Sequence, residues 1–285
     1  MSGIIITTES GTDLTCKHAE ELGIAVIPMY VVLGDETKAD GSFPVTEVMD
    51  YYQKTKAIPS TSAVNPQEYI TFFKELRSEH PEADIVHIAY TSLASSTYQN
   101  AKIALDEMED SGIYLVDSLN VSGGISLICE KAAELAKTAV SGGELTKALQ
   151  NWINRARVSF LPNTLEYLKA GGRVSNAAYL GATLLNLKPL IVIRDGKLVA
   201  SKKYRGHMEH VAFKYLEEFV QENRLERSLL YLFCVEGFSP DLMERLKKRA
   251  KEMGFSRILE TKCGCVITCH GGPGALGIAG FEAER

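Results

Sequence analysis

The sequence predicts an α/β fold of two domains. Residues 1–157 are expected to form an N-terminal domain on a doubly wound, mainly parallel sheet, and residues 158–285 a C-terminal α+β domain with a mixed sheet. Three observations predict this arrangement. The length of 285 residues exceeds the usual size of one domain. Apolar runs alternate with helical patterns in the first half, as in βαβ units, and the pattern changes at Val158–Pro162.

The first half begins with a strand, a turn and a helix. The apolar run Ile4–Ile6 is followed by hydroxyl and carboxyl side chains suited to an N-cap, and then by a helical stretch through Leu22. Further extended runs are predicted at residues 24–32, 84–89 and 112–118, and helices at residues 46–54, 66–78, 97–110 and 122–139. Because these strands are almost continuously apolar, we expect helices on both faces of their sheet.

The second half follows an amphipathic helix predicted over Glu144–Arg157. Strands are predicted at residues 188–193, 197–203 and 229–235, and helices at residues 208–222 and 239–253. The dipeptide Asp195-Gly196 predicts a tight two-residue hairpin between the first two of these strands. We expect a mixed sheet with helices on one face.

The composition argues against several classes of protein. The net charge is −5 with a pI near 5.8, and the basic residues are scattered, unlike those of a nucleic-acid-binding protein. No apolar stretch approaches the roughly 18 residues that span a bilayer, and the N-terminus begins a strand instead of a targeting segment. The six cysteines are too few and too uneven for a disulfide framework. We expect a cytoplasmic protein without stable membrane insertion and without a nucleic-acid partner.

A cysteine cluster near the C-terminus has two interpretations. Cys263, Cys265, Cys269 and His270 are residue types that bind zinc or iron. If the segment is a strand, however, alternation places the three cysteines on one face, where they fill space in the core. We favour the core role and predict no metal site.

Two hydroxyl-rich turns and one glycine-rich loop predict a site for a small acidic head group. The turns are Thr61-Ser62 and Thr91–Thr97, in which five of seven residues carry a hydroxyl. Each follows an extended run, and strand ends and helix N-termini meet in the crevice of an open α/β sheet. The alternative is capping: Thr61 could cap the helix near Pro66, and Ser96 or Thr97 is favoured as the cap of the next helix. Ser95 is left open between capping and contact with the ligand.

His270 and Arg173 could complete this site. His270 precedes Gly-Gly-Pro-Gly, so we expect an irregular backbone there that lets the imidazole approach a ligand as a cation or donor. The alternative is a histidine in a surface loop. Arg173 follows the pair Gly171-Gly172, a predicted helix C-cap, where its guanidinium could meet a phosphate, a carboxylate or solvent.

The chain resembles the DegV family of bacterial fatty-acid-binding proteins, including the acyl-carrying subunits of fatty acid kinase. The resemblance covers essentially the whole length and its motifs together are highly specific. The matching segments are Thr8–Leu14, Ile24–Pro28, Asp40-Gly41, Pro59–Ser62, the turn around Ser95, Asp117-Ser118, Leu165–Ser175, Leu185–Pro189 and His270–Gly277.

The resemblance implies that one long-chain fatty acid, such as palmitate, stearate or oleate, is buried between the two domains. In the family, residues matching Thr61, Ser95 and His270 hold the carboxylate, and we add their neighbours Ser62 and Ser96 to the expected head-group site. The resemblance also implies that the chain presents the acid to a separate DhaK-like kinase subunit of fatty acid kinase for acyl-phosphate formation and phospholipid synthesis. The chain would then have no catalytic residues and no cofactor of its own.

Arg173 is a candidate for docking the kinase partner.

The sequence departs from the family pattern at two positions, with Glu9 in place of the usual Asp and Ser96 in place of a glycine. If position 96 needs a positive φ, the serine would be strained there.

A rival hypothesis is a serine-dependent acyl hydrolase with Ser95 as nucleophile and His270 as base. The sequence has no Gly-x-Ser-x-Gly elbow around Ser95 and no clear third acid. A metal or redox protein built on the cysteine cluster is a third possibility. The fatty-acid carrier is the leading interpretation.

Overall fold

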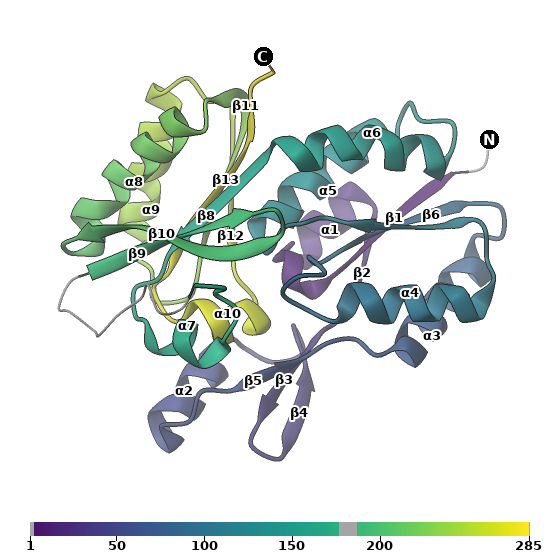
Figure 1. The fold of residues 1–285 in the computed structure, drawn as a ribbon, viewed down its shortest axis with the longest axis horizontal. Coiled ribbons are helices and arrows are strands. Elements are labelled where there is room, and N and C mark those ends of the chain that lie inside the picture. The colour runs from purple at the N-terminus through teal and green to yellow at the C-terminus, as the bar shows by residue number, and fades with distance from the viewer. Residues whose placement is uncertain (1–2, 177–186, 285) are drawn as a thin grey trace.

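The computed structural model describes residues 3–176 and 187–284, so Leu185 and Asn186 of the motif at Leu185–Pro189 lie outside the described residues. Three sheets with their helices make up this part of the chain (Figure 1). The elements of the first half are β1 (Ile4–Glu9), η1 (Ser10–Thr12), α1 (Cys16–Leu22), β2 (Ile24–Ile27), β3 (Tyr30–Leu33), β4 (Glu36–Ala39), α2 (Thr46–Thr55), β5 (Ser60–Ser62), α3 (Pro66–Glu79), β6 (Asp84–Ala89), α4 (Thr97–Met108), β7 (Ile113–Asp117), α5 (Gly123–Leu135) and α6 (Gly142–Arg155).

The second half contains the remaining elements. They are β8 (Ala156–Leu161), α7 (Glu166–Gly171), β9 (Leu187–Arg194), β10 (Lys197–Arg205), α8 (Met208–Glu222), β11 (Leu225–Cys234), α9 (Pro240–Glu252), β12 (Arg257–Lys262), α10 (Cys265–Gly271) and β13 (Leu276–Glu282). Among the described residues, no helix is long and apolar enough to cross a membrane.

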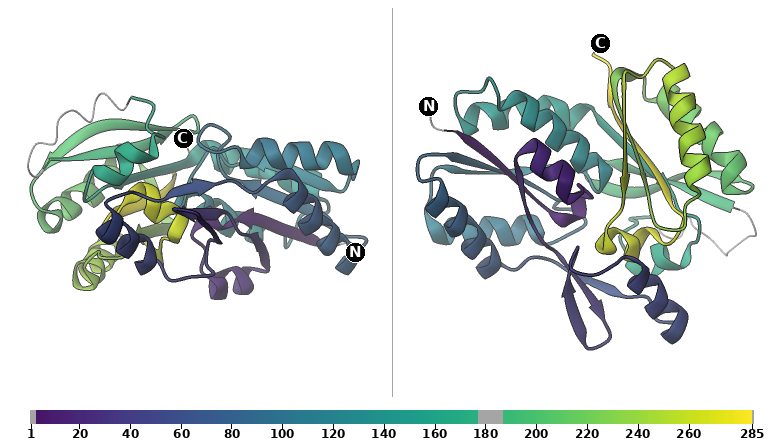
Figure 2. Two further views of the ribbon diagram at one scale, coloured as in Figure 1. Left: turned by 90° about the horizontal axis from the view of Figure 1, so that it is seen from below. Right: turned by 180° about the vertical axis from the view of Figure 1, so that it is seen from behind.

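The N-terminal sheet is parallel and doubly wound, as predicted. Its strand order is β2-β1-β6-β7, and every pair of neighbouring strands runs in the same direction. Alternate residues of β1 face different cores: Ile5 packs with α3 and α4, whereas Ile6 packs with α5 and α6. Helices therefore cover both faces, which explains why the strands are almost continuously apolar (Figures 1 and 2).

The extended run at residues 24–32 is two strands instead of the one predicted. β2 joins the parallel sheet, and β3 belongs to a separate three-stranded antiparallel sheet of order β4-β3-β5. The break falls at Pro28, which has no N–H to donate to a sheet. The small sheet projects from the N-terminal half at the bottom of the view (Figure 1).

The C-terminal sheet is mixed, as predicted, with strand order β10-β9-β8-β13-β11-β12. Only β11 and β12 are parallel neighbours; the other neighbouring pairs are antiparallel. The predicted hairpin joins β9 to β10 through Asp195 and Gly196, both with positive φ (47° and 77°), as a type I′ turn requires.

The expectation of helices on only one face of this sheet is wrong. α8 and α9 pack on one face, and α5 from the first half packs against β8, β11 and β13 on the other. The apolar surface of α5 is shared between the two sheets, so its residues 123–130 are all buried. The predicted boundary between residues 157 and 158 falls within β8 and stays a prediction.

Candidate functional site

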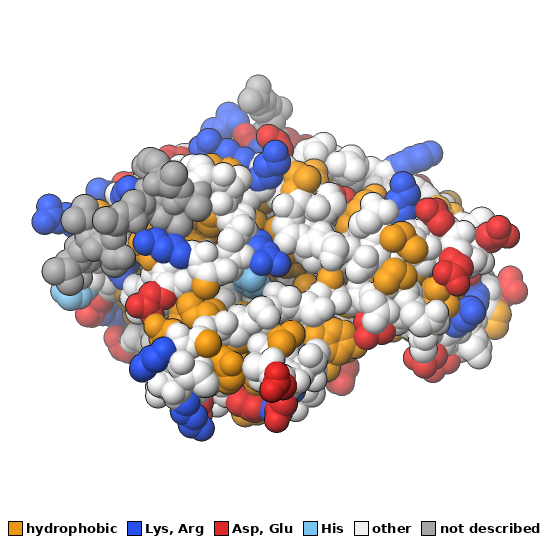
Figure 3. All heavy atoms as spheres, turned by 60° about the horizontal axis from the view of Figure 1, so that its bottom comes forward, with side chains coloured by type: hydrophobic (Ala, Val, Ile, Leu, Met, Phe, Trp, Pro, Cys, Tyr) orange, Lys and Arg blue, Asp and Glu red, His pale blue; other side chains and the backbone are white. Residues whose placement is uncertain are grey.

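One pocket brings together all six residues that the sequence singled out for the head group and its surroundings. The pocket has a volume of about 270 Å³. Its predicted lining residues are Thr61, Ser62, Ser95, Ser96, Arg173 and His270, and the other lining residues include Met29, Tyr90, Leu198 and Val266. Figure 3 shows a face of the molecule with a histidine recessed beside a basic side chain near the centre of the view.

Thr61 is held by the small sheet and does not cap a helix. It lies in β5, opposite Val31 of β3. Helix α3 is capped instead by Asn65, whose side chain accepts from the N–H of Glu68 at 3.0 Å while the Glu68 carboxylate accepts from the N–H of Asn65 at 2.8 Å. The Thr61 hydroxyl is therefore available to the pocket, and Oγ1 lies 2.9 Å from Nε2 of His270.

His270 lies in the last turn of helix α10, not on the irregular loop predicted from the glycines that follow it. The chain leaves the helix only at Gly272, which has φ 72° and ψ 165°. Burial, together with the charge of Arg173, lowers the pKa of His270 to about 4. The imidazole is therefore neutral at pH 7 and does not act as a cation there.

The other imidazole nitrogen of His270 faces the end of α7. Nδ1 is buried and has no hydrogen-bond partner among the described residues. A Cβ atom on Gly171 would lie only 2.5 Å from this nitrogen, so the close packing of α7 on α10 requires glycine there.

Ser96 occupies the N-cap position of α4, as favoured, but its side chain makes no capping hydrogen bond. Ser95 supplies the side-chain hydrogen bond at the start of α4 instead. Its Oγ accepts from the N–H of Thr97 at 3.3 Å and from the Thr97 hydroxyl at 3.2 Å. Because Oγ is the acceptor in both bonds, the Ser95 O–H can still donate to a ligand. Ser96 is exposed with φ −82°, so the strain considered for a positive φ at this position is absent.

Arg173 lies at the rim of the pocket. It is exposed and follows Gly172, the C-cap of α7 with φ 64°. Its Nη1 donates to the Gly171 carbonyl at 2.6 Å. The guanidinium therefore combines contact with the pocket and access to solvent.

A narrow apolar cavity of about 40 Å³ adjoins this pocket. Tyr90, Leu198 and His270 line both spaces. The apolar side chains that complete the cavity are Val121, Phe160, Phe233, Val235, Ile267, Ala275 and Leu276. The combination of a polar pocket and an apolar extension suits an amphipathic ligand.

The sequence model of the DegV family, a family described as uncharacterised, matches residues 3–283. The chain belongs to the DegV family.

Similar proteins extend over the whole chain. A DegV domain-containing protein of Deinococcus radiodurans is 29% identical over 279 residues, which cover 97% of each chain. A fatty acid-binding protein of Thermotoga maritima is 27% identical over 286 residues, which cover 98% of each. The solved structure of a DegV family protein from Thermus thermophilus, described by its fatty acid binding, is 27% identical and has a TM-score of 0.86, covering 99% of this chain and 100% of that chain.

A more distant solved structure has the same fold. The Fatty Acid Kinase B3 protein of Streptococcus pneumoniae, loaded with linoleic acid, has a TM-score of 0.83 at 17% identity and covers 99% of this chain and 100% of that chain.

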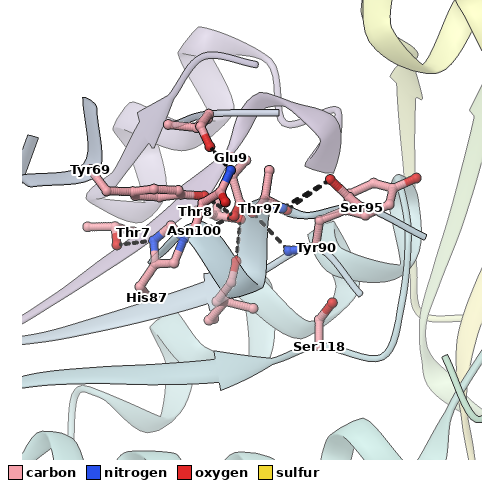
Figure 4. Close-up of polar contacts among 12 residues, drawn as sticks. Thr7, Thr8, Glu9, Tyr69, His87, Tyr90, Ser95, Thr97, Asn100 and Ser118 are labelled. Atoms are coloured by element: carbon pink, nitrogen blue, oxygen red, sulfur yellow. Dashed lines mark hydrogen bonds and ion pairs between the residues drawn. The ribbon is translucent and has the colours of Figure 1, made fainter. Parts of the chain in front are cut away.

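Beneath the pocket, this DegV family member contains a buried polar network that sequence reasoning did not identify (Figure 4). Glu9 is fully buried, and its carboxylate accepts from the Tyr69 hydroxyl at 2.6 Å and the Tyr90 N–H at 2.8 Å, with His87 Nε2 at 3.1 Å. Burial raises the pKa of Glu9, but its interactions with His87, Tyr69 and Tyr90 outweigh this and lower the pKa.

Glu9 therefore stays charged and holds the backbone of Tyr90, which lines both the pocket and the cavity. Its only sequence signal was the replacement of the family's usual Asp. Tyr69 and His87 had no such signal, because their contacts with Glu9 span 60 and 78 residues.

The cysteine cluster is part of the core, as favoured, but the segment is a helix and not the strand that was considered. Cys265 and Cys269 lie one turn apart in helix α10, and Cys263 precedes it. All three are buried, and burial raises the pKa of each thiol. No group of three or more potential metal ligands lies together within residues 3–176 and 187–284.

Proposed function

We propose that the protein binds one long-chain fatty acid, such as palmitate, stearate or oleate, and presents its carboxylate to a separate DhaK-like kinase subunit for acyl-phosphate formation. Thr61, Ser95 and His270 hold the carboxylate, with Ser62 and Ser96 at the rim. The observation that carries the proposal is the junction of the polar pocket with the apolar cavity at Tyr90, Leu198 and His270.

The pocket offers neutral donors to the carboxylate. The Ser95 O–H is free to donate. His270 is neutral at pH 7, and its Nε2 is hydrogen-bonded to the Thr61 hydroxyl. Neutral donors orient a carboxylate without forming a buried ion pair, so an oxygen stays available to attack a phosphoryl donor. The exposed cation Arg173 stands at the rim, where we place the kinase contact.

The tail supplies the affinity. Burial of about 15 methylenes contributes roughly 12 kcal/mol gross, from which the costs of ordering and association are subtracted. The cavity of about 40 Å³ has room for only one or two water molecules. Uptake of the tail therefore requires the apolar side chains around the cavity to move apart.

The relatives support fatty acid binding, because a protein of Thermotoga maritima carries that name and a structure from Thermus thermophilus is described by that property. The kinase step has weaker support: the Streptococcus pneumoniae protein named for fatty acid kinase shares the fold at 17% identity. We base that step on the exposed rim at Arg173 and on the motifs of the family resemblance.

The geometry disfavours the hydrolase alternative. Nε2 of His270 is paired with Thr61, and no hydrogen bond joins His270 to Ser95 among the described residues. Nδ1 of His270, which an orienting acid would hold in a catalytic triad, has no partner within the same residues. We therefore assign the chain no catalytic residue.

Native mass spectrometry of the purified protein, before and after addition of palmitate or oleate, tests the binding. We expect a mass increase equal to one fatty acid. Thr61→Val and Ser95→Ala should weaken retention at least fivefold, whereas Thr37→Val on the exposed face of the same small sheet and Ser92→Ala in the same turn should not. Equal retention in all four variants would reject the head-group assignment.

The kinase step is tested separately with loaded protein, ATP and a kinase subunit of the fatty acid kinase type, by trapping acyl phosphate with hydroxylamine. Arg173→Ala should mainly slow turnover and reduce retention less than Thr61→Val or Ser95→Ala does. If the protein alone hydrolyses a short-chain chromogenic ester and Ser95→Ala abolishes this activity, the hydrolase hypothesis replaces the carrier.

A further inference from the structure

Helix α10 carries His270 and is held at both of its ends by the three-stranded sheet. At its start, the Cys265 N–H donates to Asp40 Oδ1 at 2.8 Å, and Asp40 follows directly after β4. At its other end, Nε2 of His270 lies 2.9 Å from Oγ1 of Thr61 in β5. Because a helix rises about 1.5 Å per residue, the two contacts are about 8 Å apart along the axis. Where α10 sits on this small sheet therefore determines where the imidazole lies.

A second carboxylate holds the same end of α10 from a different segment. Asp13 ends η1 in the left-handed conformation (φ 60°), and its Oδ1 accepts from the Gly264 N–H at 2.7 Å. Its Oδ2 accepts from the Ser122 hydroxyl, and its backbone carbonyl accepts from the Thr261 hydroxyl at 2.6 Å. Asp13 thus connects the chain on both sides of Cys263 to the first half of the protein.

Both carboxylates are buried without a cation. Asp13 is 4% exposed and Asp40 8%, and neither forms an ion pair with a described residue. Asp40 Oδ2 has no hydrogen-bond partner in this part of the chain. Burial of such a group costs free energy, whereas the free N–H groups at a helix start stabilise an anion. The Cys265 N–H at the start of α10 is therefore the hydrogen bond that stabilises the Asp40 carboxylate, and the Gly264 N–H shares this role for Asp13 with the Ser122 hydroxyl.

We propose that Asp13 and Asp40 are positioning residues for the head-group pocket, because they hold the start of α10 so that His270 meets Thr61. Neither aspartate lines the pocket, so each acts through the helix. The role in ligand binding rests on the proposed function, but the position of the imidazole can be measured without a ligand.

The test is an NMR titration of His270 in Asp13→Ala and Asp40→Ala, with fatty acid affinity measured on the same samples. Displacement of α10 exposes the imidazole, so we expect its pKa to rise from about 4 by more than one unit toward the ordinary 6.5. We expect the affinity to fall at least tenfold. Asp13→Asn and Asp40→Asn keep the accepting oxygen and should keep the affinity within threefold of the unchanged protein.

Two further variants separate positioning from general stability. Asp84→Ala removes a carboxylate that accepts from the Gly142 N–H at 2.6 Å, at the start of a helix far from the pocket. It should lower the unfolding temperature and leave the His270 titration unchanged. Gly264→Ala keeps both aspartates, but its Cβ would lie 3.0 Å from Asp40 Oδ1, so it should shift the titration in the same direction even if the alanine variants at 13 and 40 fail to fold.

An unchanged His270 titration in folded Asp40→Ala and Gly264→Ala would overturn the positioning role. Absence of fatty acid binding by the unchanged protein would overturn the proposed function instead, while the titration would still test the positioning of His270.

Discussion

Replacement of Gly171 by alanine should weaken fatty acid binding with little loss in the free energy of unfolding. Gly171 is the last residue of α7, and its added Cβ would lie 2.5 Å from Nδ1 of His270. This distance is about 0.9 Å shorter than an ordinary van der Waals contact. The imidazole has to move by a similar amount. Because the Cβ would press on Nδ1 from outside the ring, the shift pushes Nε2 toward Thr61 Oγ1, now 2.9 Å away, and the present hydrogen-bond geometry is lost.

The magnitudes separate binding from stability. Alanine in a helix is favoured over glycine by about 1 kcal/mol, which offsets part of the roughly 1–3 kcal/mol that overpacking costs. We therefore expect the free energy of unfolding to fall by less than about 2 kcal/mol. Misplacement of one hydrogen-bonding group in the pocket costs about 1–2 kcal/mol of binding, or roughly a 5- to 30-fold loss of affinity.

The assay is displacement of a fluorescent fatty acid by palmitate, combined with urea unfolding of the same sample. The matched control is Gly143→Ala in α6, where the new Cβ would meet Tyr114 at 3.3 Å and lies far from the pocket. Wild-type affinity in Gly171→Ala would refute the assignment of His270 to the head group.

Three further predictions concern stability. Burial raises the pKa of Asp13 from 3.8 to about 7, so the folded state binds more protons than the unfolded state between these pH values. The free energy of unfolding should therefore fall as the pH rises from about 4 to 7. Asp13→Asn should remove this fall and raise the unfolding temperature at pH 8. Gly196→Ala should lower the free energy of unfolding, measured by thermal unfolding, by about 1–3 kcal/mol, because φ is 77° and the Cβ would lie 2.7 Å from Thr91 Oγ1. Gly34→Ala should lower it by less, because Gly34 has a similar φ of 68° but more space around it. Tyr69→Phe removes a donor to the buried Glu9 carboxylate and should lower the free energy of unfolding in urea by about 1.5–3 kcal/mol. Tyr30→Phe removes a part-buried hydrogen bond to Glu68 and should lower it by less. Equal losses would argue against the importance of the Glu9 network.

The elements that sequence reasoning predicted best are those with local signals. Helix α3 begins at Pro66, where it was predicted, because its capping box lies within four residues of sequence. The hairpin at Asp195-Gly196 is equally local, since a type I′ turn needs only two residues that tolerate positive φ. Helix α10 was missed: it has only seven residues, includes the β-branched Val266, Ile267 and Thr268, and is held at its start by Asp13 and Asp40.

The sequence by itself determined that the fold has one parallel and one mixed sheet, and it determined the hydroxyl-rich turns and the family resemblance, because strand periodicity, turn chemistry and motif spacing depend on neighbouring residues. It did not reveal the three-stranded sheet or strands β12 and β13. Only the tertiary structure decided that Thr61 meets His270 across 209 residues, that the imidazole is neutral, and that Ser95 supplies the hydrogen bond at the start of α4. These features depend on how the chain path brings distant segments together and excludes water from between them. Burial and distance are properties of the packed molecule, and no local pattern of residues specifies them.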